Sequence, residues 1–189
     1  KRYGVADTTA WEVGMPCGGE ITVLVQPVSD AGFPPLLFGR IARGRRMGER
    51  FAVSTDLETG LSREGEGAGF VNRYDPPRRL LIVGAVQIAQ TLVALAQQVG
   101  VAPVVIDPRG RFLTVERFPN AELDDGWPDE TIARHKPDMA TAVVTLSHDP
   151  KIDDPALIAA LAAPTGYVAA LGSRPSHAAR LGRLAGAGV

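Results

Sequence analysis

The second half of the chain alternates continuous apolar segments with helical patterns, and this alternation restricts the fold more than any other feature. The apolar segments are RRLLIVGA, APVVIDPR, TAVVTLSHD and YVAALGS. Strands without polar alternation are typical of a parallel sheet that is covered on both faces. Right-handed crossovers through the intervening helices then predict an α/β domain with a doubly wound, Rossmann-like parallel sheet over residues 78–189.

Four helices are expected in this half. Residues 86–100 have apolar side chains at helical spacing and end at Gly100, and Pro128 opens a short helix over 128–135. Asp154 is expected to cap a helix that begins at Pro155, and Ser173 to cap the last helix, over residues 174–186.

The first part of the chain predicts a smaller α+β domain over residues 1–57. Residues 20–28 and 50–56 are β-branched runs, and an apolar and basic segment after Pro34-Pro35 is expected to be helical. Residues 58–77 are rich in glycine and charge and are interpreted as a linker. Because the sequence begins without Met and ends in LAGAGV, we expect a piece of a longer protein, with the first domain incomplete.

Charge and cysteine content narrow the class of function. The formal net charge is −1, which does not favour a nucleic-acid or anionic membrane surface as partner. One cysteine excludes an intrachain disulfide and suits a reducing compartment. No apolar run approaches the roughly 20 residues that span a bilayer. A cytoplasmic protein is therefore expected.

Glycine and polar residues follow each predicted strand of the parallel sheet, where such sheets bind ligands. These candidate binding residues are Gly84, Ala85, Asp107, Arg109, His148, Gly172, Ser173 and Arg174. The first loop partly matches a dinucleotide fingerprint: Gly84 and Ala89 fit, Val86 replaces the second glycine, and Asp107 follows at the distance of a ribose-binding acid. NAD(P) is thus one candidate cofactor.

Other polar clusters leave alternatives open. His148 and Asp149 could act as acid and base, or hold a metal with Asp153 and Asp154, although such carboxylates more often cap helices. His177 could face a substrate or could lie on the exposed surface of the last helix. Four arginines between residues 40 and 46 fit a phosphate cluster or, more commonly, a solvated helix face.

The single cysteine lies in the stretch GMPCGGE, residues 14–20. Cys17 is followed by Gly18 and Gly19, which leave its sulfur and the neighbouring amides open to another molecule. A lone cysteine is more often a small apolar residue that fills a gap in the core. Taken alone, the residues leave a reactive thiol and a buried one both open.

Three segments resemble the XdhC/CoxI family, the accessory proteins of molybdenum hydroxylases such as xanthine dehydrogenase and carbon monoxide dehydrogenase. They are RYGVADTTAWEVGMPCGGEITVLVQPV, LSHDPKIDDPALIAAL and YVAALGSRPSHAARL. The resemblance implies a cytoplasmic maturation factor that binds the molybdenum cofactor (molybdopterin), assists its sulfuration and inserts it into the apo-enzyme. It further implies partnership with that apo molybdenum hydroxylase and with a cysteine desulfurase, and a homo-oligomer.

The resemblance also assigns residues. The family's cysteine matches Cys17, which becomes the candidate catalytic thiol and molybdenum contact. A thiolate is a soft ligand that suits such a metal or a carried sulfur atom. The first loop departs from the family's G-A-G-H, since Val86 and Gln87 stand at its last two positions. The family's upstream Gly-, Ser- and Pro-rich motif and its tail beyond Val189 lie outside this sequence.

Two alternatives remain, an NAD(P)-dependent or xanthine-dehydrogenase-related oxidoreductase and a nucleotide-sensing regulatory module. A maturation factor rather than an enzyme is expected, because one cysteine cannot hold an iron–sulfur cluster for electron transfer.

Overall fold

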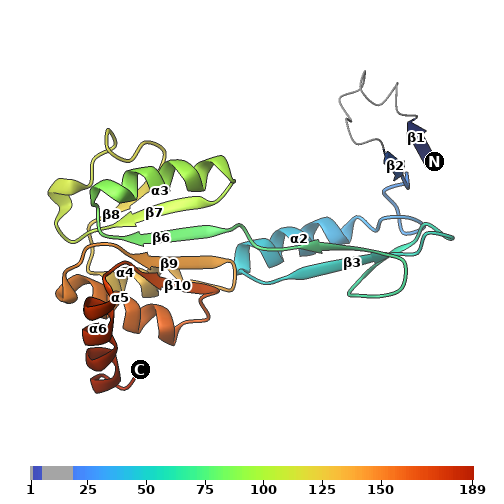
Figure 1. Cartoon of the computed structure of the whole chain (residues 1–189). Helices are drawn as coiled ribbons and strands as arrows, with labels where there is room; N and C mark the ends of the chain where they lie inside the picture. Colours follow the sequence, from blue (N-terminus) through green and yellow to red (C-terminus); the bar gives the residue numbers. More distant parts are fainter. Residues whose placement is uncertain (1, 6–18) are drawn as a thin grey trace. The chain divides into compact units, whose positions relative to one another are not determined.

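The structure is a computed structural model that describes residues 2–5 and 19–189. The chain divides into two compact units, Lys1–Tyr74 and Asp75–Val189. Figure 1 shows their elements along the chain. Each unit is described by itself below.

The second unit is built on one parallel five-stranded sheet. Its strand order is β10-β9-β6-β7-β8, and every neighbouring pair runs parallel. The strands are β6 (Arg79–Val83), β7 (Ala102–Ile106), β8 (Glu122–Asp124), β9 (Thr141–Thr145) and β10 (Tyr167–Ala170). The chain moves outward from β6 through β7 to β8 and then returns to the other side of β6, which confirms the doubly wound α/β fold.

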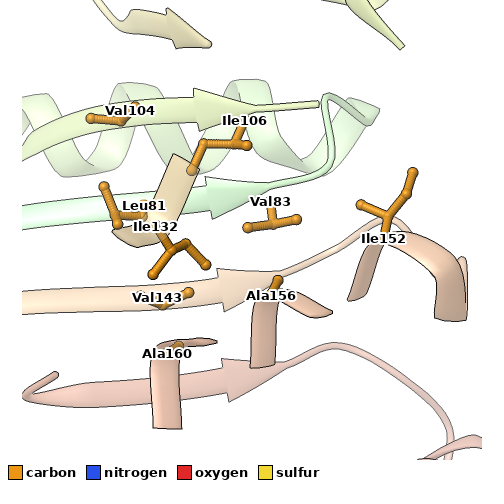
Figure 2. Packing of buried hydrophobic residues seen from close by; sticks show 9 residues of the cluster. All are labelled: Leu81, Val83, Val104, Ile106, Ile132, Val143, Ile152, Ala156 and Ala160. Atoms are coloured by element: carbon orange, nitrogen blue, oxygen red, sulfur yellow. The ribbon is translucent and has the colours of Figure 1, made fainter. Parts of the chain in front are cut away.

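Helices cover both faces of this sheet. They are α3 (Gln87–Gln98), α4 (Pro128–His135), α5 (Pro150–Ala162) and α6 (Arg174–Gly186), with a 3₁₀ turn η1 (Gly110–Phe112) after β7. Successive side chains of a strand face opposite sides, so Leu81 and Val83 pack with Ile132 and Ala156 of α4 and α5 (Figure 2). Ile82 packs on the other face, against a cluster that α3 contributes to.

Among its described residues, the first unit contains short antiparallel sheets and the helix α2. Strand β1 (Arg2–Val5) pairs with β2 (Gly19–Thr22), and β3 (Phe51–Thr55) lies between β4 (Ser62–Glu64) and β5 (Phe70–Tyr74). The helix expected after Pro34-Pro35 is α2 (Leu36–Met47). The strand expected over residues 20–28 is shorter, because β2 ends at Thr22.

Two further sequence-based expectations differ from the structure. Residues 58–77, interpreted as a linker, contain β4 and β5, whose backbone pairs with β3 and so joins them to the first unit. Helix α5 begins at Pro150 rather than at Pro155, and Asp149 caps it by accepting a hydrogen bond from the Lys151 amide at 3.0 Å. Asp154 is therefore a helical residue and not the N-cap.

In the part of the chain that the structure describes, no helix has the length and apolar character to cross a bilayer.

Candidate functional site at the carboxyl edge of the parallel sheet

The site is centred on the loops that follow β6 and β9, the neighbouring strands between which the chain reverses its direction of winding. Ligands of open α/β sheets bind at this point. Gly84 follows β6 with a φ of +109°, and a Cβ atom there would lie 2.7 Å from the Ser147 amide nitrogen in the loop after β9. Glycine at this position is what allows the two loops to touch.

Asp107 organises the first loop from within. Its Oδ2 accepts hydrogen bonds from the Ala85 amide at 2.8 Å and from Arg109 Nη2 at 2.9 Å. Its Oδ1 accepts from the Arg109 amide and from Arg109 Nε, both at 2.9 Å. Burial by itself would raise the pKa of Asp107, but these donors outweigh it and hold the pKa below its ordinary value.

These contacts correct the roles expected for Asp107 and Ala85. A carboxylate has about four lone-pair sites, and all four are used within the chain. The side chain of Asp107 is also fully buried. Asp107 therefore holds the loop and has no free oxygen for a ribose hydroxyl, and the Ala85 amide is used by Asp107 rather than offered to a phosphate.

Arginine side chains gather beside the start of α3. Arg117 donates from Nη2 to the Ala85 carbonyl at 2.8 Å, and the guanidinium groups of Arg109 and Arg111 lie over the Phe112 ring. The N-terminus of α3 has no side-chain cap and no acidic residue in its first turn. An uncapped helix start among cations is suited to an anionic group. Sequence reasoning missed Arg117, because it lies outside the strand ends and its role depends on the fold of residues 110–118.

The loop after β9 is held by a buried network. Ser147 donates from Oγ to Asp153 Oδ1 at 2.7 Å, and its amide contacts the same oxygen at 3.3 Å. His148 is exposed and has a left-handed backbone, with a φ of +61°. The metal site considered for His148, Asp149, Asp153 and Asp154 does not form: among residues 2–5 and 19–189, no three such side chains are placed to hold a metal.

Asp153 and Arg180 are the buried charged pair of this site. Their side chains are 2% and 6% exposed, and Arg180 Nη2 lies 3.7 Å from Asp153 Oδ2. Arg180 Nη2 donates instead to the Leu171 carbonyl at 2.9 Å. Asp153 Oδ2, Arg180 Nε and Arg180 Nη1 are buried without a hydrogen-bond partner. Burial raises the pKa of Asp153, because its donors do not compensate for lost water.

A cavity of about 250 Å³ lies between α5 and α6 beside this pair. We call it the α5–α6 cavity. Its lining residues are His148, Pro150, Asp153, Ser176, Ala179, Arg180 and Arg183. The sequence singled out Asp153 only as a potential ligand or cap, and gave no signal for its pairing with Arg180.

The loop after β10 presents the last three candidates on its surface. Gly172, Ser173 and Arg174 are exposed. Ser173 Oγ accepts a hydrogen bond from the Ser176 amide at 3.3 Å, so the predicted cap of α6 is confirmed. His177 is an exposed residue of the same helix.

The remaining candidates belong to the first unit. Cys17 and Gly18 lie outside the described residues, and Gly19 is the first residue of β2. Of the α2 arginines, Arg40 pairs with Glu64 of β4 and the others with described burial are exposed, as expected of a solvated face. An apolar cavity of about 480 Å³ in this unit is bordered by β3 and β5 and by residues 22–26.

Matches with known proteins include a family model, a curated relative and a solved structure. The sequence model of a family described as the XdhC Rossmann domain matches residues 80–189. The chain is 30% identical over 194 residues to the molybdenum cofactor insertion chaperone PaoD of Escherichia coli (strain K12), a match that covers 97% of this chain and 52% of PaoD. The chain thus spans about half the length of this curated relative.

The third match is a crystal structure described as a xanthine dehydrogenase from Bacillus halodurans. It has a TM-score of 0.70 and 23% sequence identity, and covers 96% of this chain and 63% of the other. At this identity the likeness supports the fold.

Proposed function

The chain belongs to the family that carries the XdhC Rossmann domain, and from this premise we propose that it is an accessory factor that binds the molybdenum cofactor as cargo for a molybdenum enzyme. One observation carries the proposal: 30% identity to a molybdenum cofactor insertion chaperone extends over 97% of this chain. The likeness therefore includes residues of both units and not only the common α/β sheet.

The donors at the sheet edge fit such a cargo. Molybdopterin carries a phosphate, and the uncapped start of α3 next to Arg109 and Arg117 suits a phosphate. Gly84 keeps this loop close to Ser147, so that the phosphate region and the loop after β9 adjoin. His148, Gly172, Ser173 and Arg174 would contribute further polar contacts from the next two strand ends.

Sulfur chemistry is the finer part of the proposal. The Cys17 thiolate would contact the molybdenum centre or carry the terminal sulfur, as a soft ligand that is followed in the sequence by Gly18 and Gly19. An apo molybdenum hydroxylase would then be the recipient and a cysteine desulfurase the sulfur donor.

No observation favours the oxidoreductase alternative. The pyrophosphate of NAD(P) must approach the backbone at the second glycine of the fingerprint, where this chain has Val86. The ribose of NAD(P) needs an acid with free oxygens, and both oxygens of Asp107 are used within the chain.

Binding of the cargo is the direct test. The purified chain is mixed with molybdenum cofactor released from a donor enzyme, passed through a gel-filtration column, and assayed for molybdenum in the protein fractions. We expect co-elution and subsequent activation of an apo molybdenum enzyme. Molybdenum that elutes entirely in the small-molecule volume would overturn the proposal, and tight binding of NAD(P) instead would favour the oxidoreductase.

Cys17 is tested separately, because it is the only thiol in the chain. Cys17→Ser should leave the free energy of unfolding within about 0.5 kcal/mol, as for a surface position, and should abolish cofactor retention or sulfur loading. Iodoacetamide should label the native protein, and bound cofactor should protect it. A thiol that reacts only after unfolding would identify a buried structural cysteine.

A further inference from the structure

Asp153 and Arg180, which line the α5–α6 cavity, have three buried polar atoms that the chain itself leaves without a hydrogen-bond partner. Two are donors, Arg180 Nε and Nη1, and one is an acceptor, Asp153 Oδ2. Buried polar groups are nearly always hydrogen-bonded, and an unmade bond to a buried charge is costly. An occupant that supplies both an acceptor and a donor would therefore be favoured here.

The combination of charges restricts the class of occupant. The free carboxylate oxygen of Asp153 disfavours an anion such as phosphate, and the free guanidinium nitrogens of Arg180 disfavour a cation. A neutral group with a carbonyl next to an N–H satisfies both partners. The raised pKa of Asp153 agrees with this, because a donor on Oδ2 is what the buried carboxylate lacks.

Space and access allow such a group to be part of a ring. The cavity measures about 250 Å³, several times the roughly 30 Å³ that one water occupies in the liquid. Its exposed lining residues, among them His148, Ser176 and Ala179, border an opening to solvent.

We infer that the α5–α6 cavity recognises the amino-pyrimidinone edge of a pterin, with Arg180 donating to the ring carbonyl and Asp153 accepting from the ring N–H and amino group. This rests on the proposed function, because molybdopterin carries that edge. Ser147 connects the two ends of the site, as it touches Gly84 at the phosphate loop and donates to Asp153 at the cavity.

The test is a binding titration of the full chain with free pterin, followed by its fluorescence. Guanosine presents the same edge and reports whether the site reads the edge alone or the pterin ring. Lumazine, which has a carbonyl in place of the amino group, should bind more weakly by roughly tenfold or more, the loss of a hydrogen bond to a charged group. Adenosine lacks the carbonyl and should not bind.

Variants assign the binding to the cavity. Asp153→Asn keeps an oxygen for Ser147 but places an amide donor at the position of Oδ2, so pterin affinity should fall by roughly 10- to 100-fold. Ala179→Leu fills the cavity from an exposed helical position and should also abolish binding, even if Asp153→Asn fails to fold. Glu130→Gln, an exposed acid-to-amide change on α4, is the matched control and should bind as the parent does.

The outcomes separate this inference from the proposed function. Pterin that does not bind, or that binds equally to Asp153→Asn and Ala179→Leu, overturns the inference; if molybdenum cofactor still co-elutes, the proposed function survives. A crystal structure with only an ordered water between Arg180 and Asp153 in the presence of saturating pterin also overturns it. Pterin binding lost in the variants, without retention of molybdenum cofactor by the parent, upholds the inference and rejects the function.

Discussion

Gly84 is constrained twice, by its backbone and by its neighbour. Its φ of +109° is rare for a residue with a side chain, and a Cβ would lie 2.7 Å from the Ser147 amide. Gly84→Ala should therefore lower the free energy of unfolding by about 1–3 kcal/mol, the usual cost of such backbone strain. Urea unfolding measures this effect. Gly182→Ala is the control: it lies in α6 with open space around it and should gain about 0.5–1 kcal/mol.

Asp107 is expected to act on stability rather than on ligand affinity. Asp107→Asn keeps the size of the side chain but replaces one acceptor oxygen with a donor that faces the Ala85 amide or Arg109. The loss should be about 1–3 kcal/mol, the cost of leaving a buried group unsatisfied. Thermal and urea unfolding measure it. An unchanged stability, with weakened ligand binding, would return Asp107 to the role of a ligand acceptor.

Asp107 and Asp153 should respond to acid in opposite ways. The pKa of Asp107 is lowered in the folded chain, so its stabilisation is complete above the unfolded pKa, near 3.8, and is lost as the pH falls through the folded pKa. The pKa of Asp153 is raised, so stability is lost as the pH rises from 3.8 through its folded pKa. As the pH falls, the free energies of unfolding of the parent and of Asp107→Asn should become more alike. The parent should instead become more stable relative to Asp153→Asn. Parallel curves for both pairs would contradict this assignment.

At the scale of elements, α5 shows how a proline can mislead. Asp154-Pro155 looks like a cap followed by a first helical position, yet α5 starts at Pro150 and Pro155 lies inside it. Pro155 therefore removes a hydrogen bond to the carbonyl four residues earlier. Pro155→Ala should stabilise the protein by about 1 kcal/mol or more, whereas Pro150→Ala, at the helix start, should be nearly neutral. Equal effects of the two changes in urea unfolding would place the helix start at Pro155.

The sequence predicts the elements whose residue pattern is visible along the chain without knowledge of their partners. Strands β6, β7, β9 and β10 are continuous apolar runs, and α2, α3 and α6 have helical spacing or a cap. Strand β8 has no such signal, because two of its three residues, Glu122 and Asp124, are charged, and only its pairing with β7 identifies it. The sequences of β4 and β5 are typical of a linker, because edge strands tolerate charge and glycine.

The candidate site also has parts that the sequence predicts and parts that it does not. The positions of Gly84, His148 and Ser173 at the strand ends follow from the order of apolar runs, so the edge of the sheet could be predicted. The saturation of Asp107 and the pairing of Asp153 with Arg180 could not, because each depends on contacts between separate loops and helices. Cys17 was found only by composition and by the resemblance of its neighbours.

At the scale of the whole molecule, the second unit contains its own core. Both hydrophobic clusters draw only on residues between Leu80 and Val168, and all five strands of the parallel sheet follow Tyr74. Residues 75–189 expressed alone should therefore fold, with far-UV circular dichroism of a mixed α/β protein and one cooperative urea transition. The slope of that transition should be smaller than for the full chain, since it scales with the surface exposed on unfolding.

The same fragment tests which unit makes each of the two proposed contacts with the cargo, pterin recognition and sulfur loading. Asp153, Arg180 and the start of α3 are retained in residues 75–189, whereas Cys17 is removed. We expect the fragment to bind pterin with an affinity close to that of the full chain and to lose sulfur loading. Calorimetry with pterin measures the first, and transfer of labelled sulfur from a cysteine desulfurase supplied with labelled cysteine measures the second. A folded fragment that no longer binds pterin would mean that the first unit contributes to the recognition we assign to the α5–α6 cavity.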